Sequence, residues 1–299
     1  MQSGLILFNK KPGITSFDAL GDIKRALGTG KVGHTGTLDK FAQGLMLVLT
    51  GKALKLSRWF SHCDKKYQGR IHFGVETDTL DPEGMETARA AVPSFEDVEK
   101  VLNQFTGNIM QEPPVYSAIH VDGKRAAKLA RKGAAPQMKM RPITIYKLEL
   151  LSWQPPFADI FVHCSSGTYI RSLARDIALA AGSRAHLSSL IRTQIGNFSM
   201  SGELLAHNSE EGRDFLVHPI NKNIISSLGL PWFEVREQEA VKIIQGKPLE
   251  QILEGKSLIT SALPLSLLFK NEAAVFEGEN LIAVIEKIDE KWKYCFVSV

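Results

Sequence analysis

The 299-residue sequence predicts an α+β fold: a mixed, largely antiparallel sheet with flanking helices, followed by a small, mainly β appendage. Two observations predict this class. Long alternating strands are separated both by helices and by hairpin-length loops, without the regular strand–helix–strand order of a parallel sheet. After Gly229 the pattern changes to short strands with one short helix. We therefore predict a large domain over residues 1–229 and a small one over 230–299.

The first part of the chain begins with a strand and a capped helix. Residues 4–10 (GLILFNK) predict a strand, which Pro12 and Gly13 end. Residues 15–18 (TSFD) have the form of a capping box, and apolar residues then recur at helical spacing: Phe17, Leu20, Ile23 and Leu27. The run 44–51 (GLMLVLTG) predicts a buried strand, 52–60 (KALKLSRWF) a helix and 66–75 (KYQGRIHFGV) an alternating strand.

The later elements follow the same two periodicities. Residues 93–107 predict a helix with Ser94 as N-cap and with these residues facing inward: Val98, Val101, Leu102 and Phe105. Residues 141–153 and 158–165 predict strands joined through Pro155 and Pro156, and residues 168–182 predict a helix that Gly182 ends. In the appendage, residues 231–249 predict a strand, a short helix and a turn, and residues 273–299 predict three short strands.

Composition narrows the class of protein. No run reaches the roughly 18 consecutive apolar residues that a membrane span requires, and the first residues are too soon broken by charge for a signal peptide. We therefore expect a cytoplasmic protein. Cys63, Cys164 and Cys295 lie far apart without the spacing of a metal site, so we expect them to be reduced and structural.

A basic cluster lies between Ser117 and Lys147. It holds eight basic residues against one acidic residue, Asp122: Lys124, Arg125, Lys128, Arg131, Lys132, Lys139, Arg141 and Lys147. Such a local excess neutralises phosphates and favours nucleic-acid binding, but a solvated helix face has the same composition. Composition alone leaves both interpretations open.

Residues 28–49 (GTGKVGHTGTLDKFAQGLMLVL) contain a formal match to the dinucleotide-binding pattern GxGxxG, at Gly28, Gly30 and Gly33. That pattern normally follows a strand and opens a helix, whereas this match follows a helix and opens a loop, which argues against a nucleotide-dependent oxidoreductase. Further along, Asp39 ends a glycine- and threonine-rich loop directly before the buried strand. It is either a rigidly held reactive carboxylate or an aspartate that caps turn amides.

Several segments together resemble the TruB family of tRNA pseudouridine synthases. Residues 33–48 (GHTGTLDKFAQGLMLV) match the family motif Gly-His-x-Gly-x-Leu-Asp followed by Ala-x-Gly-x-Leu. The resemblance covers most of residues 4–198, in the family's order, through FNKKPGITSFDAL, KKYQGRIHFGVETDTLDPEG, QEPPVYSAIHVDGKRAAKLARKG, RPITIY, CSSGTYIRSLARDI and AHLSSLIRTQIGNF. One departure is visible, because Lys40 stands where the family usually has proline. The ring that would fix this φ is missing, and a positive charge is added.

The resemblance implies a pseudouridine synthase fold with a site for a flipped uridine. It implies that Asp39 is the catalytic aspartate, acting as nucleophile or base, and that Arg171 pairs with it and keeps it ionised. It further implies that Tyr67 stacks on the uracil and that His34 packs in the space the base leaves. The other pocket residues implied are Tyr169 and Leu190.

The resemblance also implies a substrate and its contacts. The expected activity is isomerisation of uridine 55 in the T loop of tRNA, without a cofactor, a metal ion or an obligatory protein partner. The basic stretch 117–147 corresponds to an insertion that grips the T stem-loop. RNA contacts are expected from Lys11, Lys124, Arg125, Lys128, Arg131 and Arg141. Residues 230–299 correspond to a PUA-like RNA-binding domain, with a weaker match and an acidic last stretch.

Two other functions share several of these features. A guide-RNA-dependent synthase of the same superfamily carries long basic extensions, which this sequence does not show. A non-catalytic tRNA-binding or tRNA-folding protein would have the same basic arm and C-terminal module. Such a binder does not need Asp39, Tyr67 and Arg171 together, so the sequence favours the enzyme.

Overall fold

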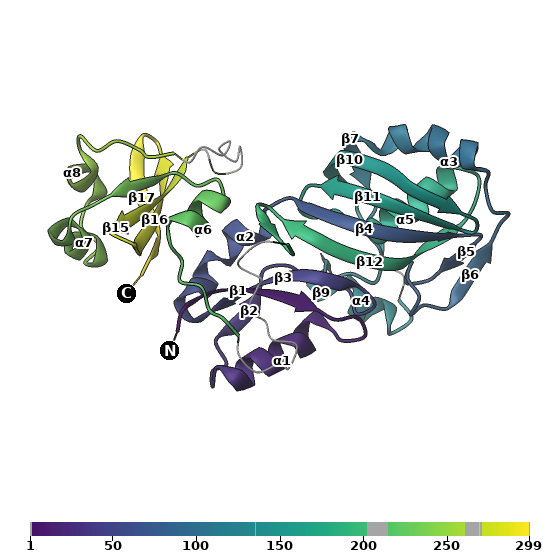
Figure 1. Ribbon diagram of the computed structural model, residues 1–299, viewed down its shortest axis with the longest axis horizontal. Coiled ribbons are helices and arrows are strands. Elements are labelled where there is room, and N and C mark those ends of the chain that lie inside the picture. Colours follow the sequence, from purple (N-terminus) through teal and green to yellow (C-terminus); the bar gives the residue numbers. More distant parts are fainter. Residues whose placement is uncertain (1, 135, 202–214, 261–268, 270, 299) are drawn as a thin grey trace.

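The computed structural model describes residues 2–134, 136–201, 215–260, 269 and 271–298 (Figure 1). Its largest feature is a sheet of nine strands: β1 (Gly4–Lys10), β2 (Val32–His34), β3 (Gln43–Thr50), β4 (Lys65–Phe73), β7 (Gly107–Gln111), β10 (Arg141–Gln154), β11 (Phe157–Cys164), β12 (Ala185–Ile195) and β13 (Phe198–Ser199). Seven strands run in the order β1-β3-β12-β4-β11-β10-β7, while β2 pairs with β3 and β13 with β12. Within this sheet the β3–β12 pairing is parallel and the other described pairings are antiparallel. The predicted α+β class is confirmed.

Three helices pack against one face of this sheet: α1 (Ser16–Ala26), α3 (Phe95–Leu102) and α5 (Ile170–Ala180). The predicted capping box at Thr15 and the predicted N-cap at Ser94 are present, and Ser94 also forms a capping box with Asp97. Both satisfy free amides of the first helical turn. Ile23 and Leu173 lie in the buried cluster between these helices and the strands. Phe17, which the spacing places on the same apolar stripe, is instead 74% exposed, with the Lys24 ammonium over its ring.

The opposite face of β1 and β3 is also covered. Successive residues of a strand point to opposite faces, so Met46 joins the cluster under α1 while Leu45 and Leu47 join a second cluster. That second cluster includes residues of the 3₁₀ helix η1 (Gly51–Leu56), of α2 (Ser57–Ser61) and of α6 (Lys222–Ser227). The predicted buried strand over residues 44–51 is therefore confirmed, with both of its faces in a core.

The C-terminal module is a four-stranded sheet in the order β14 (Trp232–Glu234), β15 (Glu272–Glu277), β16 (Asn280–Ile288) and β17 (Lys291–Val297), packed with α7 (Glu237–Ile244) and α8 (Leu249–Leu253). These elements confirm the predicted strand, helix and three later strands. Phe276 and Val284 of this module share one buried cluster with Leu5 and Trp59 of the larger part. The module is therefore packed onto the rest of the chain, at one end of its long axis (Figure 1).

The basic stretch leaves the sheet after β7 and returns in β10. Between these strands lie a short hairpin of β8 (His120–Val121) and β9 (Lys124–Arg125), followed by α4 (Ala126–Ala130). Residues 141–147 already belong to β10, so that part of the basic stretch is sheet. A second hairpin, β5 (Val75–Thr77) and β6 (Glu86–Arg89), carries the loop 78–85.

Gly44 lies where β3 meets β12, and alanine at this position is expected to destabilise the fold. The φ of Gly44 is +115°, and a Cβ atom there would lie 2.3 Å from the Arg192 carbonyl oxygen. Because backbone conformation and packing both oppose a side chain, Gly44→Ala should lower the free energy of unfolding by about 2 kcal/mol or more. Urea unfolding measures the change.

Gly21→Ala is the matched control for that measurement. Gly21 lies inside α1, and the nearest atom to an added Cβ is the Arg25 side-chain nitrogen at 3.5 Å. Alanine should therefore raise the free energy of unfolding by about 0.5–1 kcal/mol. A Gly44→Ala protein as stable as the wild type would contradict the proposed need for close strand approach.

Candidate active site

The loop between β2 and β3 carries Asp39 and is anchored on both sides of it. Before Asp39, the Ser16 hydroxyl donates a hydrogen bond to the Leu38 carbonyl oxygen at 2.7 Å and accepts one from the Leu38 N–H at 2.8 Å. Leu38 itself is buried in the main core. Packing and hydrogen bonding together therefore fix the residue that precedes Asp39.

After Asp39, the anchor is the carbonyl oxygen of Lys40. It accepts hydrogen bonds from the Gly13 N–H at 2.8 Å and from the Lys10 ammonium at 3.3 Å. Lys10 is fully buried, and burial lowers its pKa to about 8. The Lys40 side chain reaches the 78–85 loop, where its Nζ lies 3.0 Å from Oε1 of Glu83. These contacts hold the loop without the proline ring that the family usually has.

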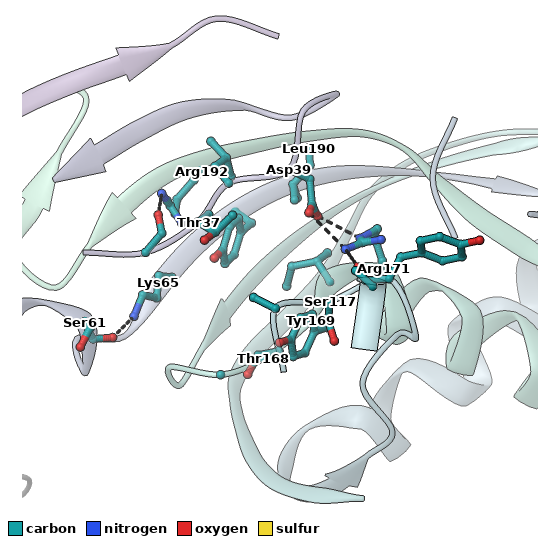
Figure 2. Close-up of a pocket in the computed structure, with 18 of the residues that line it drawn as sticks. Thr37, Asp39, Ser61, Lys65, Ser117, Thr168, Tyr169, Arg171, Leu190 and Arg192 are labelled. Carbon is teal, nitrogen blue, oxygen red and sulfur yellow. Dashed lines mark hydrogen bonds and ion pairs between the residues drawn. The ribbon is translucent and has the colours of Figure 1, made fainter. Parts of the chain in front are cut away.

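Arg171 is shared between two carboxylates. It lies in the first turn of α5 and is buried. Its Nη2 donates to Asp39 Oδ1 at 3.1 Å, and its Nε lies 2.9 Å from Asp39 Oδ2 (Figure 2). Its Nη1 donates to Asp81 Oδ2 at 3.2 Å and to the Thr79 carbonyl oxygen at 2.7 Å. Its Nη2 also donates to the Tyr116 carbonyl oxygen at 3.0 Å. These contacts fix the plane of a permanently charged group beside Asp39.

Burial and the positive charge of Arg171 shift the pKa of the Asp39 carboxyl in opposite directions. Its side chain is 35% exposed. Burial raises the pKa of Asp39 above its usual value, the Arg171 charge opposes that rise, and the Asp81 charge adds to it. A carboxylate held beside a guanidinium is suited to act as a nucleophile or as a general base.

These groups open into a pocket of about 800 Å³. Tyr67 from β4 lines it. Leu190 from β12 and Tyr169 at the N-cap of α5 also line it (Figure 2). Burial raises the pKa of Tyr67 to about 12, so this side chain is a neutral phenol. Five of the residues predicted from the sequence thus line one cavity: Asp39, Tyr67, Tyr169, Arg171 and Leu190.

His34 lies apart from these five residues. It ends β2 and is not among the lining residues of the pocket. Burial lowers the pKa of His34, and its Nδ1 atom is buried without a hydrogen-bond partner among the described residues. Its predicted role beside a flipped base stays a prediction.

The six predicted RNA-binding residues divide into two groups. Three of them line the rim of the pocket from the β8–β9 hairpin and α4: Arg125, Lys128 and Arg131. Arg141 instead lines a separate cavity of about 150 Å³. Lys11 and Lys124 are exposed and lie outside the pocket lining. The structure therefore brings half of the predicted basic contacts to the mouth of the Asp39 pocket.

Sequence reasoning did not single out four residues that hold this site: Lys10, Asp81, Gln111 and Arg192. Gln111 fixes Tyr169, because its side chain accepts from the Tyr169 N–H at 2.9 Å and donates to the Tyr169 carbonyl oxygen at 3.1 Å. Asp81 was visible only as one of two aspartates in a polar loop. A lysine or arginine within a strand gives no signal of burial, because such residues are mostly exposed.

Within the described residues, no group of three or more His, Cys, Asp or Glu side chains could hold a metal ion. The three cysteines are free, and burial raises the thiol pKa of Cys63 to about 11 and that of Cys164 to about 12, which keeps both protonated. In the described part of the chain, no helix is long and apolar enough to cross a membrane.

Comparison with known proteins decides the family. Residues 24–170 match the TruB family pseudouridylate synthase N-terminal domain. The chain is 44% identical over 211 residues to the tRNA pseudouridine synthase B of Borreliella burgdorferi, a match that covers 70% of this chain and 75% of that protein. The chain belongs to the TruB family. It is also 39% identical over 247 residues to the tRNA pseudouridine synthase B of Caldanaerobacter subterraneus subsp. tengcongensis, with 82% and 85% covered.

Solved structures share the fold of this TruB chain. A Cbf5–Nop10–Gar1 complex matches with a TM-score of 0.68 at 23% identity, over 99% of this chain and 83% of that chain. An H/ACA ribonucleoprotein bound to a substrate RNA matches with a TM-score of 0.66 at 21% identity, over 95% and 78%. At these identities the likeness is one of fold, and it confirms the expected pseudouridine synthase fold.

The contact geometry of this TruB site predicts how Asp39 titrates. Because the Asp81 charge contributes to the raised pKa of Asp39, Asp81→Asn should lower the pKa of Asp39. The asparagine side chain keeps a carbonyl oxygen that can accept the hydrogen bond from the Thr79 hydroxyl, whereas its NH₂ group replaces the oxygen that accepts from Arg171 Nη1. Titration of ¹³C-labelled aspartate carboxyls by NMR measures the shift, with the Asp39 signal assigned from Asp39→Asn.

Glu86→Gln serves as the control for that titration. Glu86 lies on β6 of the same hairpin, is exposed and pairs with Arg89. Its removal should leave the Asp39 titration unchanged. An Asp39 pKa that rises or stays constant in Asp81→Asn would show that Asp81 does not act on Asp39 as the geometry requires.

Proposed function

We propose that this TruB-family protein isomerises uridine to pseudouridine at position 55 in the T loop of tRNA, with Asp39 as the catalytic carboxylate. The observation that carries the proposal is the Asp39–Arg171 pair in a pocket that Tyr67, Tyr169 and Leu190 also line. The relatives named tRNA pseudouridine synthase B support the same activity.

The reaction needs little beyond a positioned carboxylate. The N1–C1′ bond of uridine breaks, the uracil turns, a C5–C1′ bond forms, C5 loses its proton and N1 gains one, so no oxidant or reductant is required. Asp39 acts on the sugar or the base as a nucleophile, or removes a proton as a base. Arg171 supports each of these roles because its positive charge favours the ionised carboxylate.

The pocket suits a base that has left its stack. Aromatic stacking on a flipped base contributes about 1–3 kcal/mol, and Tyr67 presents a neutral phenol ring in the pocket wall. His34 is proposed to pack where the base leaves the RNA. The exposed side chains of Arg125, Lys128 and Arg131 at the pocket rim are proposed to contact phosphates. Lys11, Lys124 and Arg141 extend the same proposed RNA contact.

The domain roles belong to the same proposal. Residues 1–229 form the catalytic domain, with 117–147 as its RNA-gripping insertion, and residues 230–299 form a PUA-like RNA-binding domain. The shared cluster of Leu5, Trp59, Phe276 and Val284 supports a fixed relation between the two parts. We propose that the protein acts in the cytoplasm on tRNA, without a cofactor or an obligatory protein partner.

Tritium release from tRNA labelled at C5 of uridine tests the activity and the role of Asp39. The wild type should release label, while Asp39→Ala and the nearly isosteric Asp39→Asn should release it only at the background rate, because neither carries a carboxylate. Glu86→Gln, at an exposed residue of β6 that pairs with Arg89, should match the wild type. Release by Asp39→Asn at the wild-type rate would remove Asp39 from the mechanism.

Two further measurements separate the rival functions. A tRNA transcript with cytidine in place of uridine 55 should give no release, and persistent release would indicate another target uridine. A wild type that binds tRNA and releases no label would support a binding or folding protein. Activity on tRNA without any added guide RNA would exclude a guide-dependent enzyme.

The basic residues at the pocket rim predict that tRNA binding weakens as the salt concentration rises. Replacing Arg125, Lys128 and Arg131 together by glutamine should weaken tRNA binding and reduce the slope of log K against log salt by about 2 to 3. The rate at saturating tRNA should stay constant, because these residues do not contact the reacting carboxylate in the described structure. Filter binding at several salt concentrations measures the slope. Arg89→Gln is the control, and an unchanged slope in the triple variant would contradict phosphate contact.

A further inference from the structure

We propose that Arg192 is a positioning residue, whose guanidinium holds the Asp39 loop by binding backbone carbonyl oxygens on both sides of Asp39. The inference rests on the proposed function, because it concerns the placement of the same carboxylate. Arg192 lies on β12, is 2% exposed and lines the pocket. Its hydrogen bonds go to the loop backbone rather than to the Asp39 carboxylate.

Strand pairing brings Arg192 to the loop. The strand β12 runs parallel to the start of β3 over two residue pairs, Ile191 with Gln43 and Arg192 with Gly44. The backbones approach so closely that only glycine fits at position 44, where a Cβ would lie 2.3 Å from the Arg192 carbonyl oxygen. Arg192 therefore stands directly beside the point where the Asp39 loop becomes a strand.

The guanidinium then spans the loop. Its Nε donates to the Leu45 carbonyl oxygen at 2.7 Å, Nη1 to that of Thr37 at 3.3 Å and Nη2 to that of Gly36 at 3.2 Å. Two of these carbonyls precede Asp39 and one follows it, so one planar group joins the two ends of the segment 36–45. Figure 2 shows Arg192 beside Thr37, on the side of the pocket away from Arg171.

Burying the positive charge of the Arg192 guanidinium costs free energy. The need to hold the Asp39 loop explains why this charge is buried. No carboxylate of the described residues forms an ion pair with Arg192, so the dipoles of the three carbonyls stabilise its charge. The guanidinium also interacts with the Tyr67 side chain. A lysine ammonium is a compact group without the planar fork, so it does not reach carbonyls on both sides of the loop.

A direct phosphate contact by Arg192 is the main alternative. The basic residues at the pocket rim are exposed, whereas Arg192 is buried and each of its side-chain nitrogens already has an acceptor. Phosphate binding would require the guanidinium to leave carbonyl oxygens that would then lose their partner. Burial and occupied donors therefore favour positioning over RNA contact.

Arg192→Gln and Arg192→Lys in the full chain test the proposal. Both should lower kcat for tritium release by about 10²-fold and leave the Kd for tRNA unchanged, because misplacing a reacting group costs rate rather than binding. Arg70→Gln is the matched control. Arg70 lies on the other face of β4 from Tyr67, is half-exposed and binds the Asp159 carboxylate, so its loss should leave kcat unchanged. All proteins are assayed below their unfolding temperatures.

Amide hydrogen exchange gives a readout that does not depend on tRNA. Residues 36–45 should exchange faster in Arg192→Gln than in the wild type, and Arg70→Gln should show no such change. The proposal is overturned by wild-type kcat in either Arg192 variant, by weaker tRNA binding at unchanged kcat, or by unchanged exchange. If the wild type released no tritium, the proposed function would fail, while the exchange data would still decide whether Arg192 holds the loop.

Discussion

The site depends on one ionic contact, that between Arg171 and Asp39. Burial raises the pKa of a carboxyl at the edge of a core, and for Asp39 the nearby positive charge of Arg171 opposes that rise more than any other group. Arg171 can supply that charge because its remaining donors are fixed by Asp81 and by the carbonyl oxygens of Thr79 and Tyr116. The shared guanidinium also joins four segments that are distant in sequence: the Asp39 loop, the 78–85 loop, the segment at Tyr116 and the start of α5. Loss of its position would therefore affect both the charge state and the placement of Asp39.

The Asp39 loop shows how rigidity arises without a stiff residue. The family's usual proline would restrict one φ angle, but this chain has Lys40 there and uses contacts from other elements. The loop backbone on either side of Asp39 is bound by Ser16 from α1, Lys10 at the end of β1, Gly13 after β1, and Arg192 from β12. Because these groups bind main-chain atoms, the loop is held whichever residue occupies position 40. The exposed Lys40–Glu83 ion pair contributes little, since such pairs are worth about 0–1 kcal/mol.

The sequence predicts the elements well because their signals are local. Capping boxes at Thr15 and Ser94, and the apolar run before Gly51, each depend on a few neighbouring residues. The TruB motifs also identify Asp39, Tyr67, Tyr169, Arg171 and Leu190, which line the pocket, since the motifs preserve spacing around reactive groups. The supports of the site depend instead on which strands pair. From the sequence alone Arg192 would be expected at the surface, and only the pairing of β12 with β3 buries it. Phe17 is the opposite case: helical spacing predicts burial, but the residue is exposed, because spacing does not reveal where the covering sheet ends.

The charges around the pocket explain how Asp39, the proposed catalytic carboxylate, and an anionic substrate can share one site. Four buried cations surround the site against the carboxylates of Asp39 and Asp81: Lys10, Lys65, Arg171 and Arg192. Backbone carbonyl oxygens, rather than carboxylates, accept most of the hydrogen bonds from these cations, so the surrounding positive potential is not cancelled. A polynucleotide brings phosphate charges that would raise the pKa of Asp39, and it excludes water, which acts in the same direction. The surplus of positive charge opposes both effects and so favours the ionised form of the carboxylate when RNA is bound.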